Sequence, residues 1–432
     1  MKDIGEIVCT VVDFGSFICL AEKLSKSYAK VNYHCPIERE FRRFEDAAIG
    51  RGIPGVKKIP SFMDIDIIKE TDLWVFPDIG YGSEQAYLKS LSKPVWGSMG
   101  ADEYERLRTL FAKVVEELGL PMVPIKTIKG VPALREHLKT VENKWVKINE
   151  FRDQMETWHH IDYDHSIPEL GRLETIFGEA RWVVFVVQDA LDGATEIGYD
   201  GWSVDGWFPD SSFQGYEAKN EAYLGARTPY DNLPEEIRMV NEKYSKVLEE
   251  YGYRNFFATE IRNHEGTPYF IDPTMRMPGQ TGEQLLETMG NLPEVIWKGA
   301  QGELVQPQWN ADFAGSATLN YKGDCSGEKV IKIPTEAERW VKLCRYGRWD
   351  GAYHFPANPR TDTGVVIGMG DTIKDTIEAV KDNFDLIGDA SLSIKSDSFV
   401  ALLDDIQKAE EDGIEFTKQE VPEPETAITQ GT

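Results

Sequence analysis

The chain has 432 residues, of which 47 are Lys or Arg and 73 are Asp or Glu, so its formal net charge is −26. A domain holds roughly 150 residues, so this length predicts about three domains. Hydrophobic residues make up 41% and charged residues 28% of the chain, which is ordinary globular usage and excludes a disordered, collagen-like or disulfide-stapled protein. The acidic excess argues against a duplex nucleic acid partner, because duplex binding depends on Lys and Arg.

Apolar runs and cysteines indicate where the protein works. No apolar run reaches the roughly 18 residues needed to span a membrane, and the apolar run near the start is too short for a signal peptide. The cysteines are odd in number, widely spaced and without a CxxC pair, and they are Cys9, Cys19, Cys35, Cys325 and Cys344. We therefore expect a cytoplasmic protein with reduced thiols, no membrane partner, and neither a zinc site nor disulfides.

The first 97 residues alternate short apolar strands with helical patterns. The predicted strands are Gly5–Val12, Ala29–His34, Asp72–Phe76 and Pro94–Trp96. Strands that alternate with helices predict a mostly parallel sheet that is covered on both faces. We assign residues 1–97 to a first α/β domain.

Residues 98–310 are expected to form a second domain. It begins with an amphipathic helix, Ala101–Leu118, whose apolar residues recur at steps of three and four. The strands expected here are Trp145–Ile148, Trp182–Val187 and the two hairpin strands Phe256–Arg262 and Pro268–Asp272. Residues 311–417 predict a third, β-rich domain with one helix at Lys374–Asn383, and residues 418–432 predict a flexible tail rich in Pro, Glu and Thr.

Two lysines are candidates for contact with a nucleotide phosphate. Lys113 lies on the amphipathic helix, and Lys147 lies inside the apolar strand Trp145–Ile148. A lysine within such a strand needs an anionic partner, because burying an unpaired ammonium is costly. A phosphate would satisfy both lysines. The alternative is a surface ion pair with a carboxylate, which for Lys113 alone is the better interpretation.

A second candidate site follows the apolar strand Trp182–Val187. The segment from Gln188 to Glu196 contains Ala190 and a glycine turn at Gly193. A strand edge followed by such a turn can present backbone groups to a base and the Glu196 carboxylate to a ribose. Acid-rich turns after strands are also common without any ligand.

The most specific signal is the hairpin that carries Glu260, Asp272, Thr274 and Arg276. Either even register, with residue 264 opposite 268 or residue 263 opposite 267, puts both carboxylates on one face. They repel each other there unless a cation lies between them, and Mg²⁺ prefers such oxygen ligands together with substrate phosphates. Arg276 is then placed to stabilise a phosphoryl group in transfer. An odd register is the alternative and would turn Asp272 to solvent.

The order of these residues along the chain resembles the ATP-grasp fold. The resemblance rests on Gly97-Ser98, the helix with Lys113, Gly119-Leu120-Pro121, the strand with Lys147, Glu196, Glu260 and Asp272-Pro273-Thr274-Met275-Arg276. Within that superfamily the chain is most similar to phosphoribosylamine–glycine ligase, through Arg276–Thr281, Ala317–Asn320 and Val366–Thr372. The resemblance covers most of the chain. It implies an ATP-grasp fold of the α/β (α+β) class, with an N-terminal Rossmann-like pre-ATP-grasp domain and a C-terminal β-rich domain.

The sequence departs from that ligase family at several points. The family has a Gly-rich loop after the strand lysine, but residues 149–157 hold no glycine, so closure over the phosphates would rely on Arg152 or another group. The family's Gly-Arg-Glu-His segment is replaced by Asp13–Ser16, which argues against phosphoribosylamine as the substrate. Asp272 stands in place of a Glu and Thr274 in place of an Asn, and both still offer oxygen to a metal ion.

The resemblance implies an ATP-dependent carboxylate–amine ligase. Such enzymes phosphorylate a small-molecule carboxylate with ATP and let an amine attack the acyl phosphate, which gives an amide, ADP and phosphate. ATP is then the nucleotide, the metal is Mg²⁺ or Mn²⁺ in its place, and the oligomeric state is open. The implied roles are phosphate binding by Lys113 and Lys147, metal binding by Glu260, Asp272 and Thr274, phosphoryl stabilisation by Arg276, base contact by Gln188 and Ala190, and ribose contact by Glu196.

Two other interpretations stay open. The missing Gly-rich loop is compatible with a degenerate ATP-grasp protein that binds nucleotide without turnover or serves as a structural subunit. A further option keeps the ATP chemistry and uses a modified nucleotide or base as the acceptor. The lysine, the carboxylate pair and the arginine, all retained in order, favour the ligase.

Overall fold

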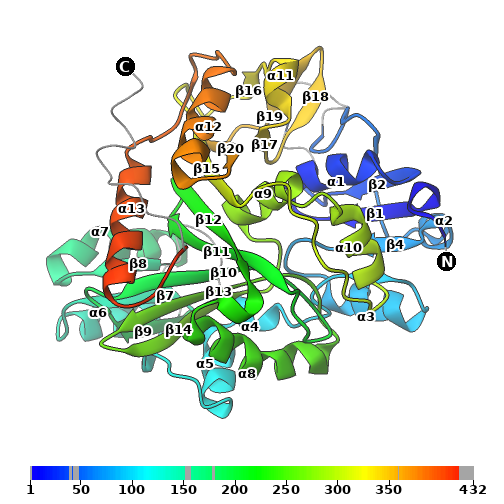
Figure 1. Ribbon diagram of the computed structural model, residues 1–432. Helices are drawn as coiled ribbons and strands as arrows, with labels where there is room; N and C mark the ends of the chain where they lie inside the picture. The colour runs from blue at the N-terminus through cyan, green and yellow to red at the C-terminus, as the bar shows by residue number, and fades with distance from the viewer. Residues whose placement is uncertain are drawn as a thin grey trace.

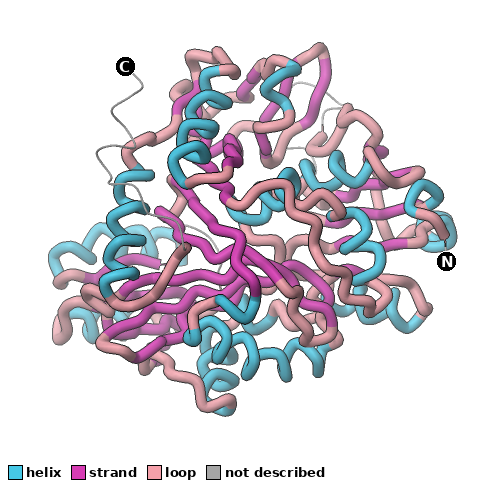
Figure 2. The backbone as a smooth tube through the Cα atoms, viewed as in Figure 1, coloured by secondary structure: helices cyan, strands magenta, loops and turns pink. Residues whose placement is uncertain are grey.

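The computed structural model describes most of the chain. The described residues are 2–37, 41, 48–150, 157–177, 181–358 and 360–417. Figure 1 shows a parallel sheet at one end, a long antiparallel sheet across the middle and a smaller antiparallel sheet beside it, and Figure 2 shows the helices that surround them. The molecule is therefore mixed α/β, as the sequence predicts.

The N-terminal sheet has five parallel strands in the order β3-β2-β1-β4-β5. The strands are β1 (Val8–Val12), β2 (Lys30–His34), β3 (Val56–Lys58), β4 (Leu73–Val75) and β5 (Val95–Trp96). The helices of this region are α1 (Ile18–Ser25), α2 (Ile65–Glu70) and α3 (Gly82–Ser90), and a 3₁₀ turn (Ile4–Glu6) precedes β1. The central strand β1 is almost wholly buried, which explains its continuous apolar run. The predicted parallel sheet is confirmed, with β3 as an additional strand.

The predicted helix over residues 101–118 is wrong in one respect, because two helices replace it. Helix α4 spans Glu103–Arg106 and α5 spans Arg108–Glu117, since Leu107 between them has an extended backbone (φ −115°, ψ 95°). Across the break the amide of Arg108 donates to the carbonyl oxygen of Asn149 (3.3 Å). The break therefore places the start of α5 beside the end of the strand that carries Lys147.

A separate small sheet has four antiparallel strands in the order β6-β9-β7-β8. The strands are β6 (Ile125–Lys129), β7 (Lys144–Ile148), β8 (Thr157–His160) and β9 (Val184–Asp189), and the helices that pack with them are α6 (Val131–Leu138) and α7 (Tyr163–Phe177). Buried residues of these elements form a hydrophobic core of their own. The small sheet carries Lys147 and Gln188 and positions both.

The longest sheet has nine strands and continues past residue 311. Its order is β14-β13-β10-β11-β12-β15-β20-β17, with β21 paired to β15. The strands are β10 (Thr195–Val204), β11 (Ser211–Ala218), β12 (Ala222–Pro229), β13 (Arg254–His264), β14 (Thr267–Thr274), β15 (Phe313–Tyr321), β17 (Val341–Leu343), β20 (Asp362–Gly370) and β21 (Leu392–Ser393). Because β12 pairs with β15, one ladder runs across the boundary that the sequence predicts at residue 310.

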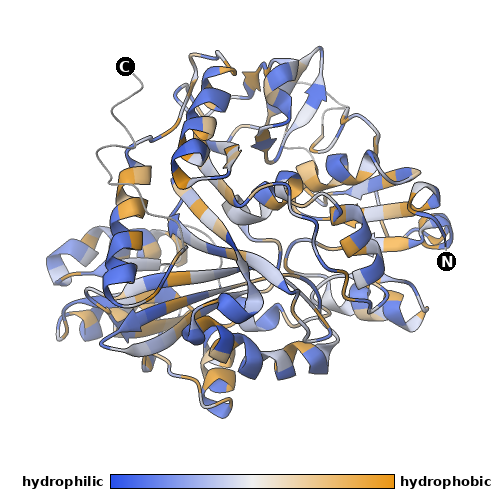
Figure 3. Cartoon of the chain, in the orientation of Figure 1, coloured by the Kyte–Doolittle hydropathy of each residue, from blue (hydrophilic) through white to orange (hydrophobic). Residues whose placement is uncertain are grey.

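The remaining elements cover or extend this long sheet. The helices are α8 (Glu235–Tyr251), α9 (Gly279–Thr288), α10 (Leu292–Gly299), α11 (Thr335–Glu338), α12 (Ile373–Asp385) and α13 (Ser398–Glu411), with a 3₁₀ turn at Tyr230–Asn232. A third antiparallel sheet, in the order β16-β19-β18, has the strands β16 (Lys329–Ile331), β18 (Gly347–Trp349) and β19 (Ala352–Phe355). Helix α13 buries Phe399, Leu402 and Ile406 and exposes polar residues such as Asp404 and Lys408, and hydrophobic and hydrophilic residues alternate along it in Figure 3.

Two further features concern the cysteines and the helices. All five cysteines are free thiols, and Cys9, Cys19 and Cys35 are buried. Within the described residues, no helix combines the length and the apolar character that crossing a membrane requires.

Candidate active site

The two carboxylates of the hairpin lie opposite each other. Glu260 on β13 pairs with Asp272 on β14 in the antiparallel ladder, so both side chains leave the same face. Near the turn the register is odd, with His264 opposite Thr267, and that register alone would put Asp272 on the other face. A β-bulge adds one residue, Ile271, to β14 and restores the pairing. The expected juxtaposition is present, through a bulge that neither even register contains.

Asp272 is surrounded by cations. Its Oδ2 lies 3.4 Å from Nζ of Lys147, and its Oδ1 lies 3.3 Å from Nη1 of Arg108. Lys147 is 8% exposed and Arg108 is 6% exposed, so each needs a charged partner. The carboxylate of Asp272 holds both cations close together, in an arrangement suited to phosphate oxygens. Arg152, the other cation considered for the phosphates, lies outside the described residues.

Arg108 is a site residue that the sequence interpretation missed. The structure does not bring Lys113 to this site, because the Lys113 side chain is 70% exposed on α5 and its Nζ lies 3.8 Å from the Glu117 carboxylate. Arg108 shares a helix face with the buried residues Phe111 and Val115, three and seven positions along. That spacing is the available signal, because a cation on the apolar face of a helix needs a buried partner and one on the polar face does not.

A narrow cavity of about 20 Å³ lies between the small sheet and the hairpin. Lys147, Gln188 and Asp272 line it, so three of the predicted residues meet here. Ala190 follows β9, and its amide donates to the carbonyl oxygen of Asn143 (3.4 Å). The structure thus places Gln188 on the cavity and the backbone donor of Ala190 in a contact with its own sheet.

Glu196 lies beside the carboxylate pair. It is opposite Arg262 in the ladder between β10 and β13. The Nη2 atom of Arg262 is 2.7 Å from Oε2 of Glu196, and the Nε atom of Arg262 is 3.5 Å from Oε1 of Glu260. Removal from water and the neighbouring charge of Glu260 raise the pKa of Glu196 to about 8. Arg262 therefore links Glu196, an acid with a raised pKa, to the hairpin.

Arg276 is held by a buried carboxylate. Glu105, 3% exposed on α4, accepts hydrogen bonds from Nε of Arg276 (3.0 Å) and from the backbone amide of Met275 (2.7 Å). Burial, opposed by the charge of Arg276, raises the pKa of the nearby Asp78 to about 6. Through its two hydrogen bonds, Glu105 fixes both the backbone at Met275 and the side chain of Arg276. No motif in the sequence marks Glu105 for that role.

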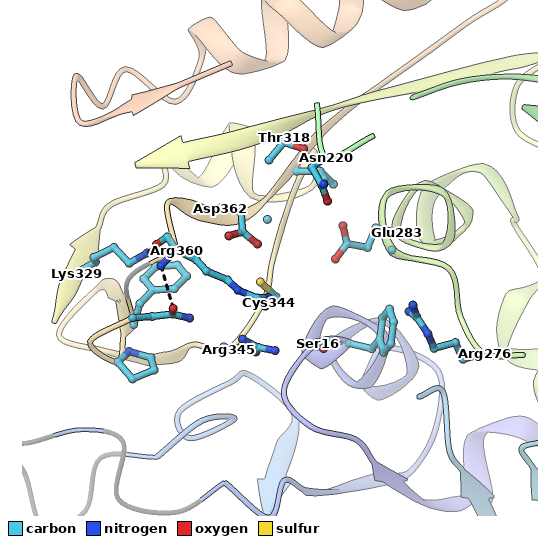
Figure 4. A pocket seen from close by; sticks show the side chains of 17 residues that line it. Ser16, Asn220, Arg276, Glu283, Thr318, Lys329, Cys344, Arg345, Arg360 and Asp362 are labelled. Carbon is cyan, nitrogen blue, oxygen red and sulfur yellow. Dashed lines mark hydrogen bonds between the residues drawn. The ribbon is translucent and has the colours of Figure 1, made fainter. Parts of the chain in front are cut away.

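A larger cavity of about 220 Å³ lies beside Arg276 (Figure 4). Its charged lining includes Glu283 from α9, Lys329 from β16, Asp362 from β20 and Arg345 from the turn between β17 and β18. These segments are far apart in the chain, so no local motif predicts that they meet.

The carboxylate pair fits a magnesium ion that also binds phosphates. Glu260 and Asp272 offer oxygen ligands from neighbouring strands, and Thr274 lies two positions beyond Asp272 on the same face of β14. Across the part of the chain that the structure describes, no three His, Cys, Asp or Glu side chains gather into a complete metal cage. Mg²⁺ usually takes one or two carboxylates and completes its shell with water and substrate phosphates, so the donor set fits.

Comparison with solved structures identifies the fold. No protein-family model and no curated protein sequence matches this chain. Phosphoribosylamine–glycine ligase from Thermotoga maritima matches in structure with a TM-score of 0.63 and 16% sequence identity, over 90% of this chain and 98% of that one. The chain has the ATP-grasp fold.

Other ATP-grasp structures match over a similar span. The biotin carboxylase domain of 2-oxoglutarate carboxylase from Hydrogenobacter thermophilus, solved with MgADP, has a TM-score of 0.65 and 13% identity and covers 97% of both chains. L-amino acid ligase from Bacillus licheniformis has a TM-score of 0.59 and 16% identity, over 91% of this chain and 99% of that one. At these identities the ATP-grasp fold is shared, while the chemistry follows from this chain's own residues.

Proposed function

We propose that this ATP-grasp protein is an ATP-dependent carboxylate–amine ligase. A carboxylate oxygen of the first substrate attacks the γ-phosphorus of ATP, and ADP leaves. An amine nitrogen then attacks the carbonyl carbon of the acyl phosphate, the carbon–oxygen bond to phosphate breaks, and an amide forms. The observation that carries the proposal is the Glu260–Asp272 pair, placed by one hairpin beside the buried cations Lys147 and Arg108.

On the nucleotide side, Lys147 and Arg108 bind phosphate oxygens. Both are buried, so their attraction to a phosphate is screened less than it would be in water. We assign the second phosphate contact to Arg108 in place of Lys113, because only Arg108 reaches Asp272. Gln188, on the same narrow cavity, is retained as a contact of the base.

The metal ligands follow from the hairpin. Mg²⁺ bound by Glu260, Asp272 and Thr274 would neutralise phosphate charge. Without that ion, Asp272 is paired with Lys147 and Arg108, and Glu260 with Arg262. The same carboxylates therefore hold the cations in place before the nucleotide arrives. Glu196 stays a candidate for the ribose on the edge of this group.

Arg276 is the residue assigned to the transferring phosphoryl group. Glu105 fixes its guanidinium through Nε, and the side chain borders the larger cavity. A cation that is positioned in advance stabilises charge as it develops in the transition state, which is often the largest single catalytic effect. Small-molecule substrates fit the cavity, and the buried thiols support the reducing, cytoplasmic location predicted from the sequence.

A hydroxylamine trap tests this function without knowledge of the amine. The full chain is incubated with Mg-ATP, hydroxylamine and a panel of carboxylic acids, and ADP and hydroxamate are measured. We expect equal amounts of ADP and hydroxamate with at least one acid, and loss of both in Asp272→Asn or without Mg²⁺. Asp210→Asn, at an exposed turn, is the control and should react as the wild type.

The opposite result is equally specific. Nucleotide binding without hydroxamate from any acid would contradict the ligase and favour a degenerate ATP-grasp protein that only binds nucleotide. Hydroxamate formation that survives in Asp272→Asn would show that another residue holds the metal.

A further inference from the structure

We propose that the cavity beside Arg276 binds the amine substrate, and that this amine also carries an acid group, either a carboxylate or a phosphate. The inference rests on the proposed ligase function and names the class of its second substrate. Glu283 and Asp362 take the ammonium group, and Lys329 and Arg345 take the acid group (Figure 4).

Lys329 is a buried cation without an anionic partner among the residues that the structure describes. It is 3% exposed. Its Nζ donates to the carbonyl oxygen of Arg360 (3.1 Å) and lies 5.6 Å and 5.9 Å from the ring centres of Tyr321 and Phe355. An ammonium has three N–H donors, and burying it without an anion is costly. The cavity in front of Lys329 is therefore suited to an anionic group of a ligand.

Arg345 supplies a second cation to the cavity. Its backbone is left-handed (φ 53°), and its amide donates to the carbonyl oxygen of Gly15 (2.6 Å), which anchors it to the N-terminal part of the chain. Over the described ranges, its guanidinium makes no hydrogen bond or ion pair. Figure 4 shows Lys329 at the left of the cavity and Glu283 at the right, with Arg345 and Asp362 between them. Two cations that line one small cavity suit a carboxylate or a phosphate.

Glu283 and Asp362 supply two carboxyl groups to the cavity. Glu283 is 7% exposed, and within the described chain its carboxyl group has no hydrogen bond and no ion pair. Lys342, the charge that acts on it, is paired with Glu287 (2.9 Å) one turn further along α9. Burial raises the pKa of Glu283 well above its ordinary value. Figure 4 shows Asp362 facing Glu283, and an ammonium between them would satisfy both groups.

An ammonium bound at Glu283 is placed to lose the proton that blocks its attack. The Glu283 carboxylate takes one proton from the ammonium, and the freed electron pair of nitrogen forms the bond to the acyl carbon. The second N–H proton leaves with the phosphate as HPO₄²⁻, so charge balances. Glu283 and Arg276 line the same cavity, which brings the base and the phosphoryl site together. A carboxyl group that holds a proton well suits this transfer.

The volume of the cavity restricts the class further. Pockets for drug-sized ligands are roughly 300–1,000 Å³. A cavity of about 220 Å³ therefore suits a small amine rather than a second nucleotide. Amino acids and phosphorylated amino alcohols combine that size with both charged groups.

Titration with defined probes tests the inference by binding alone. β-Alanine and O-phosphoethanolamine carry both groups, ethanolamine carries the amine only, and inorganic phosphate carries the acid only. We expect β-alanine or O-phosphoethanolamine to bind about tenfold more tightly than either single-group probe, as the gain of one charged hydrogen bond predicts. The tighter of the two identifies the acid group as carboxylate or phosphate.

Variants of the two cations and of Glu283 assign the two subsites. Lys329→Gln and Arg345→Gln are each expected to weaken the acid-bearing amine about tenfold to a hundredfold and to leave ethanolamine unchanged. Glu283→Gln is expected to weaken every amine and to leave phosphate unchanged. Lys332→Ala, exposed and three positions from Lys329, is the matched control. Thermal unfolding checks that each variant is folded.

Three results would overturn the inference. They are equal binding of ethanolamine and the acid-bearing amines, no binding of any probe at millimolar concentration, and wild-type binding by both Lys329→Gln and Arg345→Gln. Hydroxylamine has no acid group, so the trap separates the two proposals. If hydroxamate forms but all probes bind equally, only this inference is contradicted. If the acid-bearing amines bind more tightly but no hydroxamate forms, the ligase function is contradicted and the binding site remains.

Discussion

Lys147 and Lys329 are both more than nine-tenths buried, yet the protein surrounds their charges differently. Lys147 lies 3.4 Å from the carboxylate of Asp272 and shares it with Arg108. Lys329 has, within the described residues, a carbonyl oxygen and two aromatic rings as neighbours. The first charge is neutralised by the protein itself, and the second is neutralised by what enters its cavity.

The difference predicts two modes of binding. An anion that binds at Lys147 has to replace Asp272, which becomes free for a metal ion, so nucleotide and metal are expected to bind together. An anion that binds at Lys329 replaces no carboxylate. The anion gains the full interaction with an unpaired buried cation. Without a bound anion, the unpaired charge of Lys329 lowers the stability of the protein.

The largest effect is expected at Arg276, on the border between the two sites. Arg276→Ala should lower turnover about 100- to 1,000-fold, because a fixed cation at the reacting group contributes roughly 3–4 kcal/mol to the transition state. Affinity for Mg-ATP should stay within about twofold, since Lys147 and Arg108 remain. ADP formation and calorimetric titration check the two quantities. Arg227→Ala, at a surface ion pair with Asp312, is the control. If the variant loses affinity for ATP but keeps its turnover, Arg276 binds the nucleotide and does not stabilise the transferring phosphoryl group.

A smaller effect separates the cations of the nucleotide side. Lys147→Ala and Arg108→Ala should each weaken Mg-ATP binding about tenfold to a hundredfold, whereas Lys113→Ala should change it less than about twofold. Thermal unfolding with and without Mg-ATP measures this, because ligand at 100 times its dissociation constant stabilises its domain by about 2.7 kcal/mol. The whole melting profile has to be compared. If Mg-ATP no longer stabilises the Lys113→Ala variant but still stabilises Arg108→Ala, then Lys113 and not Arg108 is the second phosphate contact.

The smallest effect concerns stability on the cavity side. The pKa of Glu283 is raised in the folded state, so the fold binds its proton more tightly than the unfolded chain does. The free energy of unfolding should therefore fall as pH rises above about 4.5, the ordinary value for Glu. Glu283→Gln should remove this fall and be more stable by roughly 1–3 kcal/mol at alkaline pH. Urea unfolding between pH 4 and 8 measures it, with the exposed Glu116→Gln as control. If the free energy of unfolding changes with pH equally in the variant and the wild type, Glu283 is not a costly, unpaired acid.

The sequence predicts well those features that depend on local spacing. The strand with Lys147 and the hairpin with Glu260 and Asp272 follow from runs of apolar and β-branched residues. The helix break at Leu107 does not, because the periodic pattern runs through it and the contact that stabilises the break comes from Asn149, just after a strand that is distant in the sequence. The bulge at Ile271 also has no signal in the sequence, although it decides which face of the hairpin Asp272 occupies.

Residues that act through tertiary contacts leave little local signal in the sequence. Arg108 carries a signal, since it shares the apolar face of its helix. Lys113 lies on the exposed face and pairs with Glu117, which is the surface ion pair that the sequence favours for it. Glu105 and Glu283 carry none, because their burial arises from elements that are distant in the chain. The cavity of Lys329 and Glu283 is assembled from several such segments, so its chemistry is visible only after folding.

The long sheet has a consequence for how the molecule melts. The ladder that holds Glu260 and Asp272 continues through β12 and β15 to β20, which carries Asp362. Hydrogen-bonded strands with a common core exchange their amide protons as one cooperative unit, so the metal ligands and the amine cavity should become protected together. The small sheet with Lys147 has a separate core and can open independently. Amide exchange of β7 should therefore slow most when Mg-ATP binds, whereas exchange in β13, β15 and β20 should slow together when either Mg-ATP or the amine binds.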